Sequence, residues 1–110
     1  MNNKFLFMLG LCRKAGKIII GTDLVTKSLP SKKAYLVIYT SDASFNTEKK
    51  ITDKCKYYST ECIKAPFDSG EISTAIGKDG AVCVLGITDL NFAGQLKSLL
   101  SEQSDRLSMK

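Results

Sequence analysis

Apolar residues recur along the chain in two patterns, one typical of helices and one typical of buried strands. Helical spacing predicts five helices, which should open near Asn3, Thr22, Ser44, Asp68 and either Asp89 or Asn91. Continuous apolar runs predict four strands, at residues 17–20, 35–39, 62–65 and 81–87. Because the runs do not alternate with polar residues, both faces of the sheet should be covered. The pattern predicts an α/β fold: a three-layer α/β/α sandwich with a mixed sheet of about four strands.

Glycine, proline and capping residues indicate where these elements should begin and end. Gly16 should stop the first helix and Pro30 the second, while Asp68 and Glu71 have the spacing of a capping box. The fourth helix should end at Gly77. We expect one domain over residues 1–100, followed by a polar C-terminal tail over residues 101–110.

Composition fits a globular protein and adds a positive charge. The chain has 110 residues, 44% of them hydrophobic, and its formal net charge is +5. On a domain of this size the excess favours an anionic partner, with nucleic acid ahead of a membrane surface. Solubility alone is the alternative explanation of the charge.

The sequence contains few residues suited to catalysis or to metal binding. There is no histidine, which excludes His-based acid–base chemistry and every Ser-His or Cys-His pair. No phosphate-binding or dinucleotide glycine motif is present either. The four cysteines lack a C-x-x-C spacing, so we expect neither a metal nor a cofactor, only buried reduced thiols at Cys12, Cys55, Cys62 and Cys83.

The apolar run from Phe5 to Leu11 could be mistaken for an export signal. Leu11 is bulky where a cleavage site needs a small residue, and Arg13 and Lys14 follow at once. About seven apolar residues are also too few to span a bilayer. We therefore expect a buried first helix and a cytoplasmic protein.

The segment from Gly21 to Lys27 is the most informative one. On a helical wheel, Thr22, Asp23, Thr26 and Lys27 fall within an arc of about 140°, and Leu24 and Val25 lie on the other side. The apolar side should dock on the sheet. The polar side would then present hydroxyls, a carboxylate and an ammonium group beside unpaired N–H donors that favour phosphate. The alternative is an ordinary helix with a threonine cap.

A second basic segment opens the third helix. Asn46 could read a base edge, while Lys49 and Lys50 could contact phosphates. A capped, solvated helix start is the alternative explanation of these residues.

Three segments together resemble a known family. They are LGLCRKAGK at residues 9–17, GTDLVTK at residues 21–27 and DASFNTEKKI at residues 42–51. In order and spacing they are similar to motifs of the ribosomal protein L7Ae, L30e and S12e family, and most similar to its small bacterial members. The resemblance covers about residues 3–100. It implies an α/β/α sandwich that grips kink-turn RNA, a bend flanked by tandem sheared G·A pairs.

Position by position, the resemblance implies an RNA site. Gly21 would allow close backbone contact, Lys27 would reach a base or a phosphate, and Asn46 would make a polar contact. Two positions depart from archaeal members, because Asp23 replaces Asn and Leu24 replaces Glu. The archaeal apolar loop is absent near Gly77–Gly80. The full set of expected RNA-binding residues is Lys14, Lys17, Gly21, Thr22, Asp23, Lys27, Asn46, Lys49 and Lys50.

The sequence thus predicts a non-catalytic RNA-binding protein whose partner is kink-turn or ribosomal RNA, and which associates with ribosomes. A protein-interaction adaptor that uses Leu24 and neighbouring apolar surface is the alternative. A nucleotide-binding enzyme is a third possibility, which would require a deep pocket at the strand ends.

Overall fold

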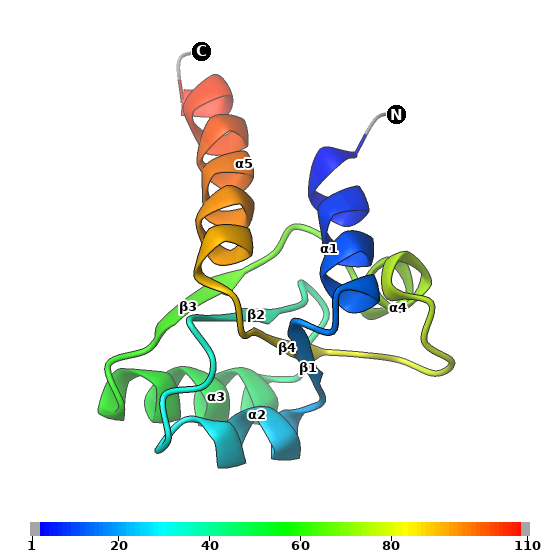
Figure 1. Cartoon of the computed structure of the whole chain (residues 1–110). Helices are drawn as coiled ribbons and strands as arrows, with labels where there is room; N and C mark the ends of the chain where they lie inside the picture. Colours follow the sequence, from blue (N-terminus) through cyan, green and yellow to red (C-terminus); the bar gives the residue numbers. More distant parts are fainter. Residues whose placement is uncertain (1–2, 109–110) are drawn as a thin grey trace.

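The computed structural model describes residues 3–108, and side chains for residues 3–100. Helices and strands alternate along it (Figure 1). The elements are α1 (Lys4–Lys14), β1 (Ile18–Ile20), α2 (Thr22–Ser28), β2 (Leu36–Tyr39), α3 (Phe45–Tyr57), β3 (Glu61–Lys64), α4 (Ser69–Ile76), β4 (Val84–Ile87) and α5 (Leu90–Ser108).

The four strands form one sheet in the order β1-β4-β2-β3. β2 and β3 run parallel, whereas β4 is antiparallel to both β1 and β2, so the sheet is mixed. In Figure 1, α2 and α3 cover one face of the sheet and α1, α4 and α5 cover the other. The predicted α/β/α sandwich is confirmed.

Each face of the sheet has its own apolar core. Under α1, α4 and α5 the core includes Phe5 and Phe67, whose rings stack with centroids 5.5 Å apart. Under α2 and α3 it includes Val25, Leu29 and Ile51, which are fully buried. Each such side chain contributes about 1.5–3 kcal/mol by leaving water. The two cores hold the helical layers at fixed positions on the sheet.

Side-chain caps define the starts of α4 and α5 as the sequence predicted. Asp68 and Glu71 form the complete capping box of α4. At the start of α5, the Phe92 N–H donates to Asp89 Oδ2 at 3.0 Å, so Asp89 rather than Asn91 is the cap.

Some expected boundaries are wrong. β4 begins at Val84 rather than Ala81, because its partners β1 and β2 end opposite Leu85 and Val84. Tyr35 lies before β2 and is half exposed. At the other end, α5 continues through Ser108, into the segment expected as a polar tail. None of the helices found over residues 3–108 combines the length and the apolar character that a membrane span requires.

The cysteines are all free, but only two are buried as expected. Cys12 and Cys55 lie in the cores, and burial raises the pKa of the Cys12 thiol to about 11, with a further contribution from Asp89. Cys62 and Cys83 are partly exposed. Cys62 lies on the edge strand β3, and Cys83 lies outside β4, so neither is covered on all sides.

Helix α1 packs closely on α4 at Gly10. A Cβ at this position would lie 2.9 Å from the Ala75 carbonyl oxygen. Gly10→Ala should therefore destabilise the protein by up to about 2 kcal/mol, because an overpacking cost of about 1–3 kcal/mol outweighs the gain of about 1 kcal/mol in helix propensity. Urea unfolding measures this difference.

Gly94 provides the matched control in α5. A Cβ there would meet no atom within 4 Å. Gly94→Ala should stabilise the protein by up to about 1 kcal/mol. Equal stabilisation by both substitutions would contradict the close packing at Gly10.

Candidate nucleic-acid interface

The start of α2 follows β1 directly and depends on a glycine. Gly21 occupies the N-cap position with φ 104° and ψ 149°, a conformation that is essentially restricted to glycine. No side chain caps the helix start, and Thr22 is the first helical residue. The alternative of a threonine cap is therefore wrong. The first N–H groups of α2 have no side-chain acceptor.

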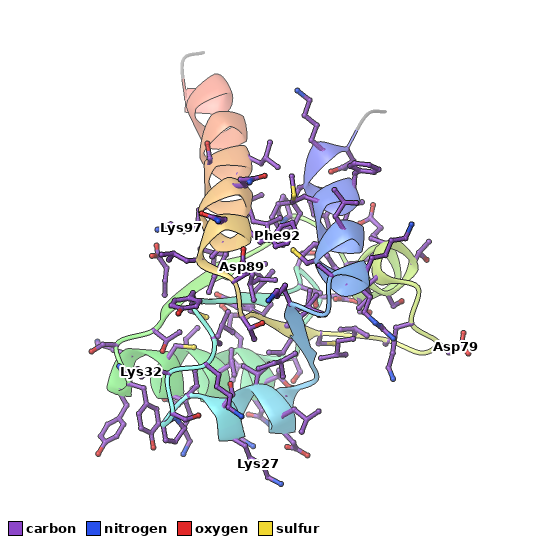
Figure 2. The ribbon with its side chains drawn as sticks, viewed as in Figure 1. Lys27, Lys32, Asp79, Asp89, Phe92 and Lys97 are labelled. Atoms are coloured by element: carbon purple, nitrogen blue, oxygen red, sulfur yellow. The ribbon has the colours of Figure 1, made fainter. Side chains whose placement is uncertain are left out.

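The polar side of α2 faces outward as predicted. Asp23 and Lys27 are exposed, while Thr22 and Thr26 are half-buried, and the Thr26 hydroxyl donates to the Thr22 carbonyl at 2.6 Å. Figure 2 shows Lys27 extending from α2 away from the sheet. No ion pair joins Lys27 to a carboxylate among the described side chains. The ammonium group is therefore available to an anionic ligand.

Leu24 does not lie where the helical wheel placed it. Val25, Ser28 and Leu29 are buried, but Leu24 is 59% exposed. Leu24 lines the open groove beside β1, and because β1 is an edge strand, no further strand covers this side chain. An apolar side chain thus borders the polar face.

The start of α3 presents a second set of exposed residues. Asn46, Lys49 and Lys50 all point to solvent, as predicted. Lys49 pairs with Asp53 at 3.2 Å, an exposed contact that lowers the positive charge it offers. Phe45, beside Asn46, is 76% exposed, and its ring could stack on an unpaired base.

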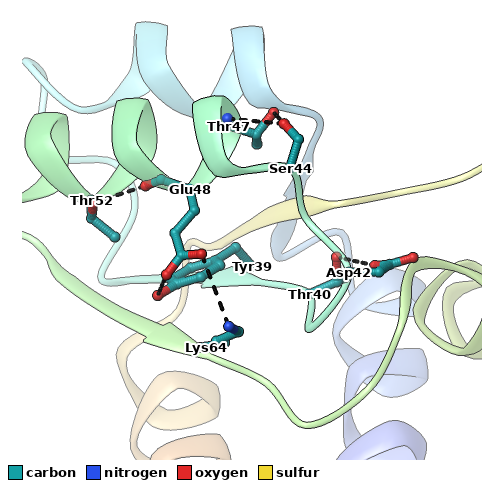
Figure 3. Close-up of polar contacts among 8 residues, drawn as sticks. All are labelled: Tyr39, Thr40, Asp42, Ser44, Thr47, Glu48, Thr52 and Lys64. Carbon is teal, nitrogen blue, oxygen red and sulfur yellow. Dashed lines mark hydrogen bonds and ion pairs between the residues drawn. The ribbon is translucent and has the colours of Figure 1, made fainter.

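Polar contacts fix this start of α3 against the sheet (Figure 3). The Tyr39 hydroxyl donates to Glu48 Oε2 at 3.2 Å, and Lys64 lies 3.9 Å from the same carboxylate group. Burial and the Glu48 charge raise the pKa of Tyr39 to about 12. The helix is thereby attached to both β2 and β3.

Asp42 connects the same loop to α4. Its carboxylate accepts hydrogen bonds from the Thr40 hydroxyl at 2.7 Å and from the Ser69 N–H and hydroxyl at 2.9 and 2.8 Å. These bonds hold the pKa of Asp42 below its usual range. The loop that leads into α3 is therefore anchored at both ends.

The structure brings most of the predicted residues into one layer. Helices α2 and α3 contact each other on the same face of the sheet, which places Gly21–Lys27 near the α3 segment (Figure 1). Lys14 lies elsewhere, because it ends α1 in the opposite layer and faces α4. Lys17 lies between α1 and β1. These two lysines are exposed, but the fold does not group them with Asn46.

Other exposed cations escaped the sequence analysis. Arg13, Lys33 and Lys78 line an open groove of about 630 Å³ together with Lys27. They come from three separate parts of the chain, and no local motif marks them. The sheet order, which puts β1 at the edge, brings them together. The described side chains contain no cluster of three or more metal-ligating residues.

Comparisons with known proteins show which proteins this chain is similar to. Residues 4–97 match the model of the ribosomal protein L7Ae/L30e/S12e/Gadd45 family. The RNA-binding protein YlxQ of Bacillus subtilis is 44% identical over 97 residues, which cover 84% of this chain and 91% of that protein. Its counterpart in Enterococcus faecium is 39% identical, over 88% of this chain and 91% of that protein.

Solved structures share the fold. A protein of unknown function from Bacillus halodurans superposes with a TM-score of 0.84 at 32% identity, covering 91% of this chain and 99% of that one. The Giardia lamblia 15.5 kD RNA-binding protein gives a TM-score of 0.72 at 16% identity, over 90% and 92% of the two chains. The chain belongs to the ribosomal protein L7Ae/L30e/S12e/Gadd45 family, which is a non-catalytic family.

Proposed function

We propose that this protein binds structured RNA through the outward face of α2 and the start of α3. The supporting observation is the outward face of α2, where Lys27 is exposed and has no ion-pair partner among the described carboxylates, and where no side-chain hydrogen bond caps the helix start. Helix N–H groups and an ammonium group are both donors for phosphate and base acceptors. The net charge of +5 and the RNA-binding names of the two YlxQ relatives support the same function.

We further propose that the RNA is a kink-turn, as in ribosomal RNA. Gly21 and Lys27 are the first and last residues of the segment GTDLVTK, which resembles a motif of the family. Asp23 can accept a hydrogen bond but cannot donate one, and Leu24 can do neither. Contacts to G·A pairs would therefore depend on Lys27 and on backbone groups.

Two RNA stems test this function. One carries a kink-turn with tandem G·A pairs, and the other replaces those pairs with Watson–Crick pairs. We expect the protein to bind the kink-turn at least about tenfold more tightly in a mobility-shift titration, since a lost base contact costs about 1–3 kcal/mol. Equal binding of both stems would contradict kink-turn recognition, and no binding of either would contradict the RNA function.

A further inference from the structure

The groove of about 630 Å³ follows the outer edge of β1. Residues 18–20 of β1 and Leu24 of α2 are its main apolar lining. Its charge has a single sign, because no carboxylate is among the residues described as lining it. The cations that line it are Arg13, Lys27, Lys33 and Lys78.

The backbone of β1 offers unused hydrogen bonds in this groove. The Gly21 N–H donates to Val84 and the Thr88 N–H to Lys17, each at 2.9 Å. Bonding alternates along an antiparallel pair, so Ile19 is the residue of β1 that faces β4. Ile18 and Ile20 therefore turn their N–H and C=O groups toward the open edge.

We propose that the groove binds an extended acidic peptide segment of another protein, which adds to β1 as a fifth strand. Donors and acceptors that alternate with a two-residue period match another polypeptide backbone. Apolar side chains of the segment would contact Leu24 and the isoleucines, and its carboxylates would face Arg13, Lys33 and Lys78, which are not part of the proposed RNA interface. This inference does not rest on RNA binding, because β1 rather than the start of α2 carries it.

Other occupants match the groove less well. A second copy of the chain would bring the same cations against each other, and like charges across an interface are repulsive. An RNA strand would satisfy the cations, but its phosphates only accept hydrogen bonds. The outward carbonyls of Ile18 and Ile20 would then depend on ribose hydroxyls and base N–H groups, whose spacing does not follow the two-residue period of a β-strand.

Amide hydrogen exchange with a defined probe tests the inference. The probe is the ten-residue peptide (Glu-Val)5, and (Lys-Val)5 is its charge-reversed control. At a peptide concentration of about ten times Kd, mass action predicts about tenfold slower exchange of the outward Ile18 and Ile20 amides. The control peptide should leave both amides unchanged. Binding of (Glu-Val)5 without protection of these amides would overturn strand addition.

Charge-reversal variants test the role of the groove cations without altering β1. Lys33→Glu combined with Lys78→Glu should weaken binding of (Glu-Val)5 by about tenfold or more. The matched control, Lys54→Glu with Lys56→Glu on α3, changes the net charge equally but lies outside the groove. If both double variants weaken binding of (Glu-Val)5 equally, the effect comes from net charge alone, and the inference is overturned. The oligonucleotide U10 is the third probe. If it slows hydrogen exchange of the Ile18 and Ile20 amides more than (Glu-Val)5 does, the groove is assigned to RNA instead.

Discussion

Lys27→Ala should weaken binding to a kink-turn stem by about 1–3 kcal/mol, which corresponds to about 5- to 150-fold in Kd. Lys27 is exposed on the outward face of α2 and has no described ion-pair partner within 4 Å. Its removal therefore takes away a free cation without breaking a contact inside the protein. Isothermal titration at fixed salt measures the change.

The affinities of the two RNA stems and their salt dependence show whether Lys27 contacts a base or a phosphate. If it reads a base, the preference for the G·A stem over the Watson–Crick stem should fall with the affinity. If it contacts only phosphate, both stems should weaken alike, and the slope of log K against log salt should decrease by about 1. Lys54→Ala removes an equal charge from the last turn of α3, outside the proposed interface, and is the control. Unchanged affinity of the Lys27 variant would remove the residue from the interface.

Gly21→Ala should lower the free energy of unfolding by about 1–3 kcal/mol, because an L-residue is strained in this backbone conformation. A Cβ at Gly21 would meet no protein atom within 4 Å, so strain rather than crowding is the cause. The added methyl group would occupy the space through which a ligand backbone approaches the α2 start. RNA affinity should therefore fall as well.

Two measurements separate these effects. Urea unfolding reports the strain, with Gly94→Ala as a substitution in equally open space but ordinary helical conformation. RNA titration without urea, at a temperature well below the unfolding transition, measures the affinity of the folded variant and so reports the approach of the ligand. Wild-type stability of the Gly21 variant would show that position 21 does not need the glycine conformation.

The fold could be predicted from the sequence where a short sequence pattern reflects the burial or the local hydrogen bonds of the same residues. The β2 run Leu36–Tyr39 is buried at every position, which is the condition that its continuous apolar pattern expresses. The caps at Asp68 and Asp89 are satisfied by neighbours three residues away. Such features depend on short stretches of chain and can be identified from them.

Features that depend on distant parts of the chain could not be predicted. The helical wheel placed Leu24 on the sheet, but the actual contact of a seven-residue helix is set by what lies beneath it. The proximity of Arg13, Lys33 and Lys78 likewise follows from the position of β1 at the sheet edge. Side chains such as Asn46 and Lys50 were predictable as exposed, since they lie opposite the buried Ile51 and Cys55 on an amphipathic helix.

The central place of β4 has a consequence for the order of folding. β4 is the last strand to be synthesised, yet it joins β1 to β2. β1 therefore has no pairing partner in the nascent chain until a segment about 70 residues further on has left the ribosome, which is a large sequence separation for a chain of this size. β2 and β3 can pair earlier, so β1 should be the last strand to join the sheet.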